Sequence, residues 1–194
     1  MGENLPVFPL NSVLLPGGIL PLRIFEPRYV DMVSHCLRND SGFVVAIIKK
    51  GRETGAAAEF YSIGTLAKII DWERCSDGLL GITAQGCNKA RILNWKVEKN
   101  QLIHGDIESF LNEPQNDLPL EFEKLSLMLK RILKELGSPY PTQAKDFADA
   151  GWVAGRLVEL LPLELAQKQA LLELEDPLSR LFQLRDNLLN LELL

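Results

Sequence analysis

The spacing of hydrophobic and polar positions changes part-way along the chain, and this change predicts two kinds of structure. Before residue 110 the apolar residues gather in short runs such as Phe43–Ile48 and Ile63–Ile70, bounded by glycine, serine or charged residues. Short apolar runs rich in β-branched residues favour buried β-strands. After residue 120 the apolar residues recur every three or four positions, as in Phe122–Leu136, which is typical of amphipathic helices. The pattern therefore predicts a β-rich first part and a helical second part.

The β-rich part contains further candidate strands and one clear turn signal. Asp77 and Gly78 lie between the run 63–70 and the run 79–84, and this dipeptide favours a hairpin. The remaining candidate strands are 91–93, 95–98 and 102–107. Many short strands at this spacing indicate a small antiparallel barrel or a strongly bent sheet.

Five prolines interrupt the apolar opening of the chain, and they exclude a continuous helix there. They are Pro6, Pro9, Pro16, Pro21 and Pro27. The pattern predicts a strand, a turn at Pro16–Gly17, a second strand and then a helix over 27–38, because proline suits the first helical position. The apolar face of this helix comprises Tyr29, Met32, Val33, Cys36 and Leu37.

The pattern of the second part predicts a helical bundle that follows a proline-containing linker at 111–119. Helices are predicted at 122–136, 143–161, 163–175 and 177–191. Their predicted core residues are Leu165, Leu172, Leu178, Leu181, Phe182, Leu184, Leu188 and Leu189. The expected fold class is therefore α+β, with a β-rich subdomain at 1–113 and a helical-bundle subdomain at 114–194.

Charge and composition narrow the function classes. The chain has 194 residues and a net charge of −5. Residues 1–110 carry 12 acidic and 12 basic side chains, and residues 111–194 carry 14 and 9, so the excess lies in the helical part. Neither part has the basic footprint that nucleic-acid binding requires. With three cysteines, no C-x-x-C pair, no secretion signal and no apolar span of membrane length, we expect a cytoplasmic protein that binds no membrane.

Three blocks of the sequence match one known family. The first contains Phe8-Pro9-Leu10, Leu15-Pro16-Gly17 and Ile24-Phe25-Glu26-Pro27-Arg28-Tyr29; the second is Ile63–Ile69, followed by Gly86 and Arg91-Ile92; the third, weaker block lies within 160–184. Together they resemble the N-terminal domain of Lon proteases over nearly the whole chain. The resemblance implies a PUA-like β subdomain with one helix, a helical bundle behind it, and substrate binding without chemistry. It also implies a free-standing form of this domain, without ATPase or protease modules.

The sequence holds no motif that indicates catalysis. It contains neither G-x-x-x-x-G-K-[ST] nor G-x-S-x-G, and its only histidines are His35 and His104. His35 precedes Cys36, but neighbours on a helix point about 100° apart, so a buried structural cysteine is the favoured interpretation. The cysteines and histidines show no metal-ligand spacing. We therefore expect no enzyme activity, no metal and no cofactor.

The leading hypothesis is a non-catalytic module that binds unfolded or apolar protein segments. The alternative is an adaptor that docks one defined partner through its acidic helical part, and an RNA-binding PUA-like module is disfavoured by the net acidity. The predicted contact residues are Phe60, Tyr61 and Trp72, with Arg23 or Arg28 at the edge. The competing interpretation is that the aromatic residues only close the barrel and that Arg28, with Glu26, fastens the helix to it.

Overall fold

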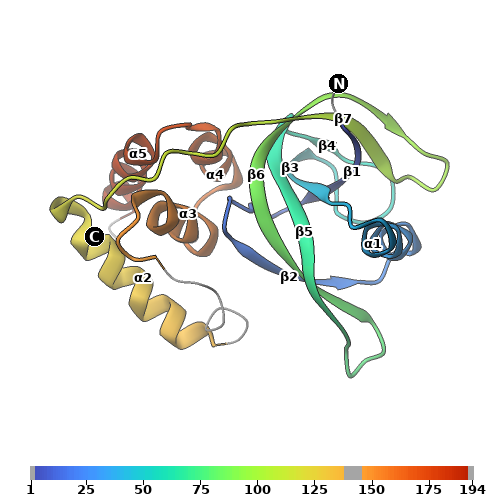
Figure 1. Cartoon of the computed structure of the whole chain (residues 1–194), viewed down its shortest axis with the longest axis horizontal. Helices are drawn as coiled ribbons and strands as arrows, with labels where there is room; N and C mark the ends of the chain where they lie inside the picture. The colour runs from blue at the N-terminus through green and yellow to red at the C-terminus, as the bar shows by residue number, and fades with distance from the viewer. Residues whose placement is uncertain (1–2, 138–145, 192–194) are drawn as a thin grey trace. The chain divides into compact units, whose positions relative to one another are not determined.

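The computed structural model describes residues 3–137 and 146–191 (Figure 1). It divides the chain into Met1–Leu111, named here the β unit, and Asn112–Leu194, named here the helical unit. The described residues form a mixed architecture of one mostly antiparallel sheet and five α-helices, together with a short 3₁₀ helix. This confirms the expected combination of an antiparallel sheet with helices.

The sheet of the β unit has seven strands in the order β1-β7-β6-β5-β3-β4, with β2 paired to β6. Their bounds are β1 (Glu3–Leu10), β2 (Ile19–Ile24), β3 (Phe43–Lys50), β4 (Glu59–Phe60), β5 (Ile63–Arg74), β6 (Leu80–Val97) and β7 (Ile103–Ser109). All pairs are antiparallel except β1 with β3, which is parallel. Because β1 also pairs with β3, the ladder of β1, β7, β6, β5 and β3 returns to its first strand.

Strand β1 accommodates two prolines because most of its residues pair with only one neighbouring strand. Its first half, including Pro6, pairs with β7, and its second half, including Pro9, pairs with β3. A proline lacks only its own N–H, so it fits a position whose nitrogen faces the unpaired side. The prolines therefore shorten the stretch that is paired on both sides without ending the strand.

The β5–β6 hairpin is longer than the sequence pattern predicts. β5 continues four residues past Ile70, and the candidate strands 79–84, 91–93 and 95–98 all fall within the single long strand β6, apart from Leu79 and Glu98 at their ends. At the tip, the Cys75 N–H donates to the Leu79 oxygen and the Gly78 N–H to the Cys75 oxygen, while Gly78 has φ +85°. This is a three-residue hairpin turn with glycine in the left-handed region. In Figure 1 the hairpin tip projects beyond the rest of the β unit.

Helix α1 (Pro27–Asn39) packs against the sheet through its apolar face. Tyr29, Met32, Val33 and Cys36 are buried in a core with Phe8, whereas Leu37, predicted on the same face, is exposed. The rings of Phe8 and Tyr29 stack at 3.9 Å between centroids. A second core of the β unit gathers Leu5, Val7, Val44, Ala46, Ala90, Ile92, Ile103 and Ile107.

The helical unit contains η1 (Leu120–Phe122), α2 (Glu123–Leu136), α3 (Ala150–Leu160), α4 (Leu165–Glu173) and α5 (Pro177–Asn190). The first residues of the helix predicted at 143–161 lie outside the described residues. Of the predicted core, Leu172, Leu181, Leu184 and Leu188 are buried, whereas Phe182 and Leu189 are exposed. None of the described helices is both long and apolar enough to cross a membrane.

Candidate functional site

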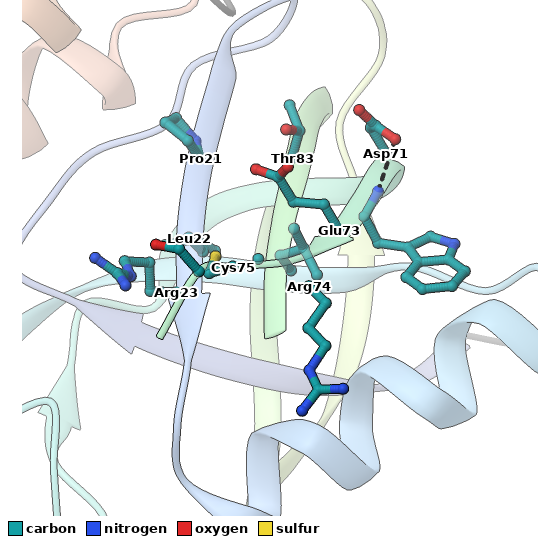
Figure 2. Close-up of a pocket in the computed structure, with 12 residues that line it drawn as sticks. Pro21, Leu22, Arg23, Asp71, Glu73, Arg74, Cys75 and Thr83 are labelled. Atoms are coloured by element: carbon teal, nitrogen blue, oxygen red, sulfur yellow. Dashed lines mark hydrogen bonds between the residues drawn. The ribbon is translucent and has the colours of Figure 1, made fainter. Parts of the chain in front are cut away.

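A candidate site lies on a three-stranded part of the sheet, where β2 and β5 flank the beginning of β6. Pro21 and Asp71 both lie opposite Thr83, and Arg23 and Glu73 both lie opposite Gly81. Directly opposed residues of antiparallel strands project from the same face. Figure 2 shows Pro21, Thr83 and Asp71 in one row across the three strands. These residues line a pocket of about 570 Å³, which we name the sheet-face pocket.

Gly81 opens this pocket because it places no side chain in the middle of the row formed by Arg23 and Glu73. A Cβ at position 81 would lie 2.9 Å from Cys75 Sγ and 3.2 Å from Glu73 Cγ. The absence of a side chain therefore leaves room on the face of β6. A pocket of several hundred cubic ångströms is large enough to bury several side chains of a ligand.

Two predicted contact residues, Arg23 and Trp72, line the same pocket. Arg23 projects from the exposed end of β2 and forms an ion pair with Asp77 in the hairpin turn. Trp72 lies opposite Ile82, and Ile82 lies opposite Leu22, so the indole belongs to the face that carries the α1 core. Trp72 lies on β5, the outer strand of this region, and 61% of the residue is exposed.

Charged residues of β5 complete the site, and the sequence pattern misses them. Asp71 and Glu73 alternate with Trp72 along the strand, and Arg74 points away from Glu73 (Figure 2). In the sequence, Asp71 and Glu73 are isolated charges near an expected turn, and this pattern indicates side chains in solvent. Their role as pocket walls depends on the pairing of β5 with β6, and only the hairpin register reveals it.

Phe60 and Tyr61 lie away from the sheet-face pocket, and neither is among its lining residues. Phe60 is half-buried against the second core and tilts against Trp95, with ring centroids 5.4 Å apart. The Tyr61 N–H donates to the Ile47 oxygen, and Lys49 Nζ lies 6.0 Å from the centre of the Tyr61 ring. Arg23 and Trp72 thus both border the sheet-face pocket, although their side chains project from opposite faces of the sheet, whereas Phe60 and Tyr61 lie elsewhere.

Arg28 is only 4% exposed, and its guanidinium is held by several groups of the β unit. It donates to the Gln101 oxygen at 2.9 Å and to the Glu53 oxygen at 3.3 Å, and it forms an ion pair with Glu26 at 3.1 Å. The same group lies 4.6 Å above the Tyr29 ring. This environment favours the interpretation of Arg28 as a fastening for α1.

Groups with nucleophilic or metal-binding chemistry are not assembled elsewhere in the described residues. Cys36 is buried, its thiol lies 3.5 Å from the Gly42 oxygen, and burial raises its pKa, which disfavours the reactive thiolate. His35 is engaged by the Asn39 amide at 3.2 Å. No group of three or more histidine, cysteine, aspartate or glutamate side chains suited to a metal ion occurs in the part of the chain that the structure describes.

Comparison with known families decides what kind of domain carries this pocket. Residues 4–189 match the model of the ATP-dependent protease La (LON) substrate-binding domain. The chain belongs to this family. The resemblance seen in the sequence is therefore confirmed, and it relates the chain to substrate binding in proteolysis.

Individual members of the Lon group agree with this assignment. The chain is 31% identical to a Lon protease of Trichlorobacter lovleyi over 193 residues, which cover 95% of this chain and 23% of that protein. It is 26% identical to Lon protease 2 of Myxococcus xanthus, covering 92% of this chain and 22% of that protein. The chain thus spans less than a quarter of the length of these curated relatives.

Solved structures agree as well. The crystal structure of a Lon N-terminal domain protein from Xanthomonas campestris superposes with a TM-score of 0.76 at 35% identity, covering 95% of this chain and 98% of that one. The N-terminal domain of the Mycobacterium avium complex Lon protease shares the fold, with a TM-score of 0.62 at 21% identity over 95% of this chain and 97% of that one.

Proposed function

We propose that this chain binds unfolded or apolar segments of other proteins at the sheet-face pocket and catalyses no reaction on them. The observation that carries the proposal is a pocket on one face of β2, β5 and β6, bordered at β5 by the exposed Trp72, whose indole projects from the opposite face, in a chain of the Lon substrate-binding family. Tryptophan offers a large apolar surface that can remain exposed to water, and it is enriched among residues that dominate binding energy. A pocket with mixed polar and apolar walls suits ligands of varied sequence.

The pocket walls also bear on the class of ligand. Asp71 and Glu73 provide two carboxylates on the pocket face, whereas Arg23 is already paired with Asp77 and Arg74 projects from the opposite face of β5. Phosphate groups would meet like charge along β5. This arrangement supports a protein ligand rather than a nucleic acid.

The test uses reduced and carboxymethylated α-lactalbumin, a permanently unfolded protein, carrying a fluorescent label for anisotropy. Trp72→Ala should weaken binding at least about tenfold, because a segment that enters the pocket across β5 loses the aromatic contact at the outer strand. Its melting temperature should stay close to that of the unmodified chain, since exposed substitutions change stability by about 0.5 kcal/mol or less. The matched control is Trp95→Ala, because Trp95 is 53% exposed on another part of β6 and lies outside the pocket.

A different outcome would favour the adaptor function. Phe182 and Leu189 of α5 are exposed apolar side chains in the acidic helical unit, as a docking surface for one partner requires. If the unmodified chain fails to bind the unfolded protein at tens of micromolar, the proposed function is wrong. If Trp95→Ala weakens binding as strongly as Trp72→Ala, the sheet-face pocket is not the site.

A further inference from the structure

Strand β5 has an open edge along its second half. β3 pairs with β5 only at Thr65–Ala67, while β6 pairs along its other side as far as Arg74. From Lys68 to Arg74, no other described strand lies beside β5. An open edge offers backbone N–H and C=O groups to an additional strand. The other outer strand of this region, β2, carries Pro21 near its centre and lacks that donor, whereas β5 contains no proline.

The hairpin geometry identifies which backbone groups face this edge. The Cys75 N–H donates to the Leu79 oxygen at 2.9 Å, so the pair at the hairpin tip is hydrogen-bonded. Hydrogen-bonded and non-hydrogen-bonded pairs alternate along an antiparallel ladder. Counting inward from the tip, Glu73 and Asp71 direct their backbone groups to β6. Trp72 and Arg74 therefore direct theirs away from β6, toward the open edge.

The Asp71 side chain accepts a hydrogen bond from one of these outward-facing backbone groups. The Trp72 N–H donates to Asp71 Oδ1 at 2.9 Å, the bond drawn as a dashed line at Asp71 in Figure 2. By the same alternation, the Arg74 N–H also faces the open edge. A local carboxylate that satisfies an edge donor protects the edge from indiscriminate pairing. Because an incoming strand can replace that carboxylate, the edge remains available to a suitable peptide.

The side chains along this edge define which peptide suits it. Asp71 and Glu73 project from one face, where Arg23 is paired with Asp77, and Trp72 and Arg74 project from the other face. Opposite charges and apolar pairs across strands stabilise a sheet, whereas like charges destabilise it. At the beginning of the edge, Lys68 Nζ lies 3.8 Å from Asp40 Oδ1, so Lys68 also forms an ion pair with an acidic side chain.

We propose that an extended peptide adds to β5 as a further strand, with basic residues opposite Asp71 and Glu73 and an apolar residue opposite Trp72. The inference rests on the proposed function and specifies its ligand: segments that alternate basic and apolar residues. The residue opposite Trp72 exchanges hydrogen bonds with the Trp72 backbone. The flanking basic residues direct their N–H groups away from β5.

The test compares synthetic peptides with the full chain. The probe is Thr-Lys-Val-Lys-Val-Lys-Thr with blocked ends, and the matched control replaces each lysine with glutamate. The lysine peptide should bind at least about fivefold more tightly, because two cross-strand pairs change from repulsive to attractive. Glu73→Lys should reduce or reverse this preference. In amide hydrogen exchange by NMR, Arg74 and Trp72 should gain protection on binding.

N-methylation separates strand addition from simple charge attraction. Methyl groups on the two valine nitrogens remove the N–H groups that face β5 and should abolish binding. Methyl groups on the lysine nitrogens, which face away, should leave most of the binding. Equal affinity of the lysine and glutamate peptides, or equal effects of both methylations, would overturn the inference. Binding of unfolded α-lactalbumin that depends on Trp72 would then still support the proposed function, whereas failure of every probe would reject both.

Discussion

Arg23 and Arg28 are close in sequence, yet their surroundings assign them opposite roles. Arg23 extends into solvent and pairs with Asp77 at the hairpin tip. Arg28 is buried and joins the start of α1 to the backbone at Gln101 and Glu53. A buried guanidinium with several acceptors stabilises the segments that supply them, whereas an exposed ion pair contributes little. At the residue scale, burial separates a contact residue from a structural one.

The first prediction follows from this contrast. Arg28→Met should lower the free energy of unfolding by about 3 kcal/mol, because it removes the partner of Glu26 and leaves the two carbonyl oxygens without their donor. Arg23→Met should change it by less than about 0.5 kcal/mol. Urea unfolding followed by tryptophan fluorescence measures both. A stable Arg28→Met chain that has lost binding would instead identify Arg28 as a contact.

A second prediction concerns His104 on β7. Burial lowers the pKa of His104 below its usual value, Glu98 opposes this shift, and Lys96 and His35 reinforce it. The unfolded chain therefore takes up a proton at higher pH than the folded chain does. His104 therefore makes a constant contribution to the free energy of unfolding above about pH 7.5. This free energy decreases as the pH falls below about 6.5.

This prediction is checked by comparing thermal unfolding of the unmodified chain and His104→Gln at pH 7.5 and pH 5.5. The loss of stability between the two pH values should be smaller in the variant. Equal losses would show that other groups cause the acid sensitivity.

At the scale of elements, the β5–β6 hairpin determines where the candidate site forms. The sequence predicts the buried run Ile63–Ile70 and the turn at Asp77–Gly78, because burial and turn chemistry leave local signals. It does not predict the extension through Arg74, since charged residues and an exposed tryptophan show no apolar alternation. A register shift between Ile69 and Asp71 further breaks the period of two. The pocket walls Asp71 and Glu73 therefore become visible only with the strand pairing.

In the first thirty residues, by contrast with the β5–β6 hairpin, the sequence predicts the elements closely. The turn at Pro16–Gly17 and the helix start at Pro27 are local backbone preferences, so the sequence predicts them closely. The pairing of the proline-containing β1 with two other strands depends on distant partners. Local signals thus identify the elements, and long-range pairing determines which side chains meet.

Gly86 provides a prediction at this scale. It lies in β6 against the turn before β2, where the Gly17 N–H donates to the Gly86 oxygen and the Gly86 N–H to the Gly18 oxygen, each at 2.9 Å. A Cβ at this position would overlap the Leu15 carbonyl oxygen. Gly86→Ala should therefore cost about 1–3 kcal/mol of stability in thermal unfolding. An unchanged midpoint would mean that the turn moves aside without loss.

At the scale of the whole molecule, the chain combines a β unit that carries the pocket with a helical unit. We propose that they are separate domains, with a boundary close to residue 113. Leu111 is almost fully exposed, whereas Glu113 pairs with the buried Arg180 and Asn116 bonds to Asp149, both within the helical unit. Limited digestion with chymotrypsin should therefore cut first near Leu111. A first cut inside β6 or α5 would contradict two independently folded domains.

We propose that unfolded protein segments bind at the three-stranded region of β2, β5 and β6, and this placement can be tested directly. The most direct measurement is photocrosslinking of benzophenone-labelled, carboxymethylated α-lactalbumin to the chain, with the adducts mapped by mass spectrometry. Adducts are expected within residues 19–24 and 71–83, and they should be lost in Trp72→Ala but not in Trp95→Ala. Adducts concentrated on the helical unit, or around Phe60 and Tyr61, would contradict it.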